Sequence, residues 1–200
     1  MINVLVVGSA NPDKSKEIKE IFGHPGLTIK DLREFDNVPE IEEDRNSLQG
    51  NALKKALELY KFLGLPVISD DTGLEVDALQ GAPGVFSARY AGEDATYNDN
   101  IDKLLLELQE VPPDKRTARF ATVTVYYNGT HEVVTEGSVE GLITIERRGT
   151  QGFGYDPIFE TLETRQTFAE MTSDAKHAIS HRGRALRKLF LELQQRNIIS

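Results

Sequence analysis

Two adjacent carboxylates, Asp70 and Asp71, follow a short apolar run and are the sharpest sign of chemistry in the chain. Neighbouring carboxylates repel each other and are costly to bury without a cation. Because the chain has no cysteine and few plausible imidazole ligands, an all-oxygen site with phosphate oxygens favours Mg²⁺ over Zn²⁺. In a straight strand the two side chains point to opposite faces, so a shared site requires the chain to turn at Thr72-Gly73. Alternatively, one carboxylate binds metal and the other orients water, or the pair lies in a solvated turn.

Further oxygen ligands occur in the acidic run DNVPEIEED, which has five acids and no base. Composition does not choose among Glu40, Glu42, Glu43 and Asp44. Residues 174–188 have the opposite character, with five Lys or Arg against one Asp. This separation suits an anionic substrate bridged to carboxylates by a metal ion, although two solvated surface segments would give the same pattern.

A polar loop separates a predicted strand at 2–7 from a predicted helix that ends before Gly23. Its residues are Ser9, Ala10, Asn11, Pro12, Asp13 and Lys14. Free backbone N–H groups and the dipole at a helix start favour a phosphate group there, and Lys14 adds a positive charge. The alternative is that Asn11 only caps the helix, with Pro12 at its first position, and both interpretations can hold together.

A second loop carries an aromatic ring between two glycines and next to a carboxylate. Its sequence is Gln151-Gly152-Phe153-Gly154-Tyr155-Asp156-Pro157. A base could stack on the ring, and Asp156 could accept the N1–H of a 6-oxo purine, whereas adenine has an acceptor at N1. A turn that buries its aromatic residue in the core is the alternative.

His177 and His181 lie four residues apart, which is the spacing of a zinc pair on a helix. The sequence HAISH lacks the Glu of HExxH, however, and no third soft ligand is near, so zinc is not expected. His181-Arg182 at a helix start, with Lys176 nearby, is better interpreted as a set of donors to an oxo group or to phosphate. A basic, solvated helix end is the alternative.

Hydrophobic periodicity places these residues on an α/β fold with a mixed sheet. Helices are predicted at 12–22, 47–63, 98–109 and 182–195. Extended segments are predicted at 2–7, 67–68, 73–79, 117–127, 130–136 and 139–145. Asn128-Gly129 predicts a two-residue hairpin turn after the fourth of these segments.

Length and composition are those of one globular domain spanning residues 1–200, with room for two lobes. The N-terminal segment lacks the basic start of a signal peptide, and no apolar stretch reaches the roughly 18 residues of a membrane span. A net charge of −9 argues against binding a nucleic-acid polymer. The absence of cysteine fits a cytoplasmic protein.

Five ordered segments together resemble the inosine triphosphate pyrophosphatase family, and they cover nearly the whole chain. They are Ser9-Ala10-Asn11 with Lys14, Ser69 to Leu74 (SDDTGL), Gly81 to Tyr90 (GAPGVFSARY), Gly152 to Pro157 (GFGYDP), and Thr167 to Met171 (TFAEM) with Ser180-His181-Arg182. The resemblance implies a long mixed sheet with flanking helices and two lobes around a central cleft. It also implies a homodimer that uses Mg²⁺ to hydrolyse purine nucleoside triphosphates with non-standard bases, namely those of inosine, deoxyinosine and xanthosine, to monophosphate and pyrophosphate.

The resemblance also assigns roles to individual residues. Ser9, Asn11 and Lys14 would hold phosphate, within a substrate loop that includes Ala10, Pro12 and Asp13. Glu40 and Asp71 would bind the metal, and Asp71 would accept the proton of the attacking water, with Asp70 beside it and Thr72 touching substrate. The nucleotide pocket would comprise Phe153, Gly154, Tyr155, Asp156, Lys176, His181 and Arg182.

Two positions depart from the family pattern. Ala10 stands where the family more often has Gly, Ser or Thr, and Gly50 stands where many relatives have Glu. Two other functions fit the same residues: a phosphatase that removes the γ-phosphate, and a non-catalytic nucleotide-binding module. The acid pair argues against the second.

Overall fold

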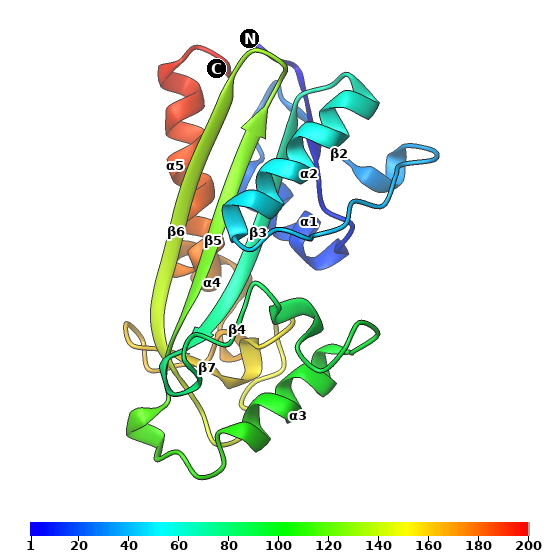
Figure 1. Ribbon diagram of the computed structural model, residues 1–200. Helices are drawn as coiled ribbons and strands as arrows, with labels where there is room; N and C mark the ends of the chain where they lie inside the picture. The colour runs from blue at the N-terminus through cyan, green and yellow to red at the C-terminus, as the bar shows by residue number, and fades with distance from the viewer. Residues whose placement is uncertain (200) are drawn as a thin grey trace. The chain divides into compact units, whose positions relative to one another are not determined.

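The computed structural model describes residues 1–199, which form an α/β structure with one mixed sheet (Figure 1). The strands are β1 Val4–Val7, β2 Thr28–Asp31, β3 Val67–Val76, β4 Pro83–Gly84, β5 Thr117–Tyr127, β6 Glu132–Ile143 and β7 Phe159–Thr161. The helices are α1 Pro12–Phe22, α2 Leu48–Leu63, α3 Tyr97–Glu107, α4 Ser173–Ile179 and α5 His181–Gln195. The predicted fold class is confirmed.

The sheet has the strand order β2-β1-β3-β5-β6-β7, with β4 paired to β3. Strand β1 is parallel to both β2 and β3, whereas β4 and β7 are antiparallel to β3 and β6. Parallel neighbours need a crossover, and α1 and α2 lie in the connections that follow β1 and precede β3. The pairing of β1 with β3 therefore places the loop that follows Val7 next to the middle of β3.

The chain divides into two compact units. Unit 1 comprises Met1–Asp71, Thr122–Gly137 and the chain from Arg182 onward, and unit 2 comprises Thr72–Ala121 and Ser138–His181. Strands β3, β5 and β6 contribute residues to both units. The two predicted lobes correspond to these units, and the cleft implied by the resemblance stays a prediction.

In unit 1, helices cover both faces of the sheet (Figure 1). Ile18 of α1 and Leu186 of α5 pack with Ile68 of β3, whereas Ala52 of α2 packs with Val125 of β5 in a separate cluster. Side chains alternate between the two faces along a strand. Consecutive residues of β3 therefore face different helices, with α1 and α5 on one side and α2 on the other.

The core of unit 2 is rich in aromatic rings. Phe120, Phe159 and Phe168 are buried together, with ring centroids 4.7 to 6.1 Å apart, and Ile101 and Leu104 of α3 belong to the same cluster. Aromatic pairs at such distances add to the stabilisation that burial alone provides.

Helix α2 begins and ends close to the predicted bounds of 47–63. The Ser47 side chain accepts a hydrogen bond from the Gly50 N–H, and Gly64 ends α2 at φ 65°, in the left-handed region that suits glycine. Helix α4 was not predicted. Ser180 has an extended backbone between α4 and α5, so His177 and His181 lie on different helices and the spacing of a zinc pair does not apply.

The strands differ from the prediction in continuity. Strand β3 runs unbroken from Val67 to Val76, so the turn considered at Thr72-Gly73 does not occur. The segments predicted at 130–136 and 139–145 form the single strand β6, and β5 connects to it through four residues instead of two. The Asn128 side chain accepts hydrogen bonds from the N–H groups of Thr130 and His131, and this local pairing stabilises the longer turn.

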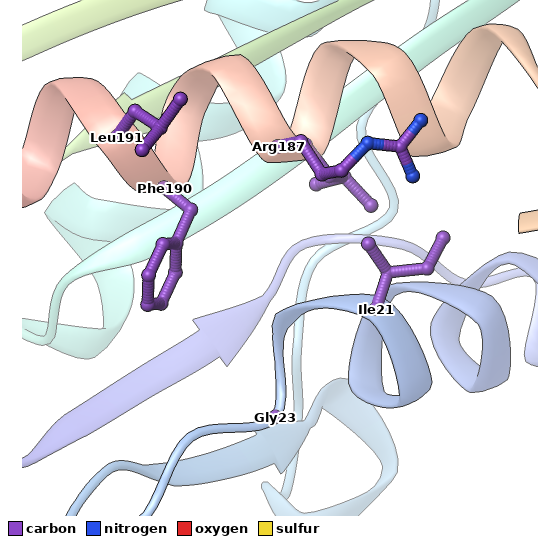
Figure 2. A pocket seen from close by; sticks show the side chains of 6 residues that line it. Ile21, Gly23, Arg187, Phe190 and Leu191 are labelled. Atoms are coloured by element: carbon purple, nitrogen blue, oxygen red, sulfur yellow. The ribbon is translucent and has the colours of Figure 1, made fainter. Parts of the chain in front are cut away.

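A cavity of about 250 Å³ lies where the end of α1 meets α5 (Figure 2). It is lined by Ile21, Gly23, Leu186, Arg187, Phe190 and Leu191. None of the predicted site residues is in this lining. Within residues 1–199, no helix is long and apolar enough to cross a membrane.

Candidate functional site

The predicted phosphate loop of unit 1 begins where β1 ends. The Asn11 side chain caps α1 by accepting from the N–H groups of Asp13, at 2.9 Å, and Lys14, at 3.3 Å, while Ser9 Oγ accepts from the Asn11 N–H at 3.2 Å. The capping interpretation is therefore confirmed, with Pro12 at the first helical position. Two N–H groups at the helix start already have a partner, so the side chain of Lys14 becomes the principal charge this loop can offer to phosphate.

Lys14 points toward the acid pair, because its Nζ lies 3.6 Å from Asp70 Oδ2. Asp70 is fully buried, and it also accepts two hydrogen bonds of 3.1 Å from the guanidinium of Arg182, at Nε and Nη2. Arg182, only 2% exposed, binds Glu17 of α1 as well. Burial would raise the pKa of Asp70, but the cations Lys14, Arg182 and Lys55 outweigh burial and hold it well below its usual range.

Asp71 lies in a different environment, although it follows Asp70 directly. Its Oδ2 accepts a 3.0 Å hydrogen bond from Asn51 Nδ2 of α2, and the residue is 4% exposed. Burial raises the pKa of Asp71, and the charges of Lys14 and Lys55 offset this only in part. A carboxylate with a raised pKa is a better proton acceptor than an ordinary one. The structure therefore assigns different chemical characters to the two acids.

The acidic run reaches this site through Glu43. Glu43 is partly buried, binds Lys55 Nζ and interacts electrostatically with Asp71, whereas Glu40 is exposed. Burial would raise the pKa of Glu43, but Lys55 and Lys14 lower it. Lys55 also donates to the Asp70 carbonyl oxygen at 2.6 Å. Of the four acids considered, Glu43 is the one held beside Asp71 by contacts of this kind.

These carboxylates fit a magnesium site. Mg²⁺ is commonly held by one or two carboxylates and completes its octahedron with waters and substrate phosphates. Asp71 and Glu43 supply two such groups. In the described part of the chain, no cluster of three or more His, Cys, Asp or Glu side chains is placed to hold a metal ion by itself.

The second set of predicted residues lies in unit 2. Asp156 is buried and accepts from the Phe153 N–H at 2.9 Å and from Lys176 Nζ at 2.6 Å. The Lys176 ammonium lies 4.8 Å from the centroid of the Phe153 ring and 5.5 Å from that of Phe168. A cation at this distance from an aromatic face is attracted to it, so Lys176 ties the loop to the core.

Other members of this set have mixed surroundings. The Phe153 ring is half-buried and packs against Tyr97, whereas Tyr155 is buried and donates to the Ser87 carbonyl oxygen at 2.9 Å. The alternative of a turn that buries Phe153 in the core is not what the structure shows, because Phe153 is half-buried. Tyr155 is the ring of this loop that lies in the core. The His181 ring stacks on Phe120, with centroids 4.5 Å apart and an interplanar angle of 17°.

The predicted residues are therefore distributed between the units. Unit 1 brings together Lys14, Asp70, Asp71 and Arg182, and unit 2 brings together Phe153, Asp156 and Lys176, while Thr72 is half-buried in β3. Glu40 does not join the first set. Three further buried polar residues of this site, Glu17, Asn51 and Lys55, were not predicted from the sequence. Their signal was present, because each is a polar residue on the apolar face of a predicted helix.

Comparison with known proteins places this geometry in a family. The model of the Ham1 family matches residues 5–192. The chain belongs to the Ham1 family. A dITP/XTP pyrophosphatase of Bacillus cereus is 48% identical over 188 residues, which are 92% of each chain, and one of Geobacter sulfurreducens is 46% identical over 183 residues, which are 91% of this chain and 92% of the relative.

Solved structures of Ham1 proteins share the fold. The HAM1 protein of Coxiella burnetii superposes with a TM-score of 0.86 at 39% identity, covering 97% of this chain and 100% of that one. The Ham1 protein of Staphylococcus aureus gives 0.85 at 36% identity, covering 96% and 99%. The resemblance drawn from the five motifs is confirmed as Ham1 membership across nearly the whole chain.

Proposed function

We propose that this protein hydrolyses the triphosphates of inosine, deoxyinosine and xanthosine to the nucleoside monophosphate and pyrophosphate. The observation that carries the proposal is the buried pair Asp70 and Asp71, in which the Arg182 guanidinium binds Asp70 and leaves Asp71 as the proton acceptor. Membership in a family whose relatives are named dITP/XTP pyrophosphatases supports the substrate class. Such an activity would remove deaminated purines before they enter DNA or RNA.

In the proposed reaction Asp71 accepts a proton from the water that attacks the α-phosphorus. A carboxylate in this position must be ionised and must be oriented toward the water. Asp71 Oδ2 accepts a hydrogen bond from Asn51 Nδ2. The proton moves from the water oxygen to Asp71, the new bond joins that oxygen to the α-phosphorus, and the bond to the bridging oxygen of pyrophosphate breaks.

Cationic groups in unit 1 would hold the triphosphate. Lys14 lies beside Asp70 and is partly exposed, so its ammonium can contact phosphate oxygens. Mg²⁺, when bound by Asp71 and Glu43, would draw charge from the phosphate oxygens and stabilise the leaving pyrophosphate. Arg182 would act indirectly, since its guanidinium holds Asp70 and Glu17.

In the proposed recognition of the base, the Phe153 ring stacks on the purine. Asp156 accepts the N1–H of the base, and His181 donates to the 6-oxo group. An adenine base would present an acceptor at N1 and an amino donor at C6, and would leave buried groups without partners. Lys176 keeps the loop in place by binding Asp156.

The test is to incubate the protein with inosine triphosphate and Mg²⁺ and to quantify pyrophosphate and orthophosphate separately. Pyrophosphate equal to the inosine monophosphate formed, abolished by a chelator, supports the proposal. Orthophosphate as the first product would indicate a γ-phosphatase, and tight binding with no product would indicate a binding module. We also propose that the enzyme is a cytoplasmic homodimer, as the resemblance implies. Light scattering in solution tests the dimer.

A further inference from the structure

Asn51 connects Asp71 to the backbone of the segment that follows the acidic run. Its Nδ2 donates to Asp71 Oδ2 at 3.0 Å, and its Oδ1 accepts from the Arg45 N–H at 2.9 Å. The side chain is almost fully buried, with 1% of its surface exposed. One amide thus joins β3 to the segment that follows the acidic run.

We propose that Asn51 is a positioning residue that fixes the carboxylate of Asp71 relative to the acidic segment. This inference rests on the proposed function, in which Asp71 receives the proton of the attacking water. An amide has one acceptor oxygen and one donor nitrogen. Because the Arg45 N–H can only donate, the amide oxygen of Asn51 must face Arg45. The NH₂ group of Asn51 therefore faces Asp71.

The helix that carries Asn51 is itself tied to β3 by two further hydrogen bonds, both from residues that follow Asn51 in α2. The carbonyl oxygen of Ala52, the next residue, accepts a 2.6 Å hydrogen bond from Ser69 Oγ, and Lys55, one turn later, donates to the Asp70 carbonyl oxygen. Asn51 and Lys55 lie on the same helix face because they are four residues apart. These hydrogen bonds between α2 and β3 fix the position of Asn51 along the strand, next to Asp71.

The approach of Arg45 to α2 depends on Gly50. A Cβ atom at position 50 would lie 2.9 Å from Arg45 Cβ and 3.0 Å from Ser47 Oγ, closer than side chains normally pack. The glycine that departs from the family pattern therefore accommodates the close contact in which the Arg45 N–H reaches Asn51.

Groups that orient a functional carboxylate without touching substrate typically change activity about 10- to 100-fold when they are removed. Asn51→Leu removes both hydrogen bonds at similar volume. Asn51→Asp keeps an acceptor for the Arg45 N–H but places an oxygen, not a donor, against Asp71. Both variants should lose turnover, because both lack the donor.

Lys54 supplies the matched control. It also lies in α2 and binds the acidic segment, through the Glu42 carbonyl oxygen at 2.8 Å and Asp44 at 2.9 Å. Lys54→Met therefore weakens the link between α2 and that segment without touching Asp71. It should leave kcat within about twofold of wild type, a small change on the logarithmic free-energy scale.

The experiment measures kcat and KM for inosine triphosphate in wild type and the three variants, together with thermal unfolding. We expect both Asn51 variants to lose about 10- to 100-fold in kcat while KM stays within about threefold. Nucleotide binding by calorimetry checks that each variant is folded, and if Asn51→Leu does not fold, Asn51→Asp decides.

Wild-type kcat in Asn51→Asp, or an equal loss of kcat in Lys54→Met, would overturn the inference, since the donor to Asp71 would then not be what matters. A wild-type protein that releases no pyrophosphate would instead overturn the proposed function. The two failures are thus distinguishable.

Discussion

Asp70 and Asp71 are consecutive on β3, but their carboxylates contact different helices. Arg182 of α5 binds Asp70, and Asn51 of α2 binds Asp71. Because side chains alternate along an unbroken strand, the two acids lie on opposite faces. The strand thereby separates two carboxylates that would repel each other, and it allows their pKa values to move in opposite directions.

Asp71→Asn should abolish most turnover while leaving nucleotide binding measurable. The substitution keeps the shape of the side chain but removes its ability to accept a proton, and a positioned acid-base group contributes about 10² to 10⁴ in rate. Single-turnover kinetics gives the rate, and calorimetry with inosine triphosphate gives the binding. Turnover within about threefold of wild type would move the proton acceptor elsewhere.

Asp70→Asn should act chiefly on stability. Removing one partner of a buried ion pair costs about 3 to 5 kcal/mol, and the lower end applies here because Arg182 keeps Glu17. Denaturant unfolding of both proteins measures the difference.

The pH dependence of that difference has a definite sign. The folded pKa of Asp70 is lower than its ordinary value of 3.8, so the ionised group stabilises the fold fully above pH 3.8, and this contribution is lost as pH falls toward the folded pKa. The stability gap between wild type and Asp70→Asn should therefore narrow below pH 3.8. A gap that widens on acidification would contradict this account of the pair.

Glu43→Gln and Glu40→Gln together decide which acid helps to bind Mg²⁺. Glu43 interacts with Asp71, whereas Glu40 is exposed. We expect Glu43→Gln to raise the Mg²⁺ concentration for half-maximal rate by about 10- to 100-fold and Glu40→Gln to leave it nearly unchanged. The opposite result would show that Glu40, the ligand that the family resemblance implies, binds Mg²⁺ and that Glu43 does not.

Asp156→Ala should reduce selectivity for the base. In wild type, inosine triphosphate should be preferred over adenosine triphosphate by roughly 10² to 10⁴ in kcat/KM, because two mismatched groups each cost about 1 to 3 kcal/mol. The substitution also releases Lys176 and the Phe153 N–H, so kcat/KM for inosine triphosphate should fall as well. If the ratio of kcat/KM for inosine triphosphate to that for adenosine triphosphate is near one in wild type, or stays large in Asp156→Ala, this loop does not recognise the base and has only a structural role.

Much of the fold could be predicted from sequence because its signals are local. Asn11 and Ser47 cap their helices, Gly64 ends α2, and apolar spacing gave the helix faces. The unbroken course of β3 could not be read from Thr72-Gly73, because its neighbours in the sheet decide it. Tertiary pairing overrides local turn preference in such segments.

The candidate site was predicted less completely, for a related reason. Asp71 and Lys14 were recognised from their residue types, but the partners that distinguish Asp71 from Asp70 come from distant parts of the chain. Arg182 is 112 residues from Asp70, and Asn51 is 20 residues from Asp71. Sequence spacing alone does not show which face of a strand each partner will reach.

Hydrolysis in water enriched in ¹⁸O tests the central claim most directly, because it reports which phosphorus is attacked. With inosine triphosphate and Mg²⁺, the account predicts that the label enters inosine monophosphate and that the released pyrophosphate carries none. Label in pyrophosphate would mean attack at the β-phosphorus, and labelled orthophosphate would mean attack at the γ-phosphorus. Either result would contradict the assignment of Asp71 to water attack at the α-phosphorus.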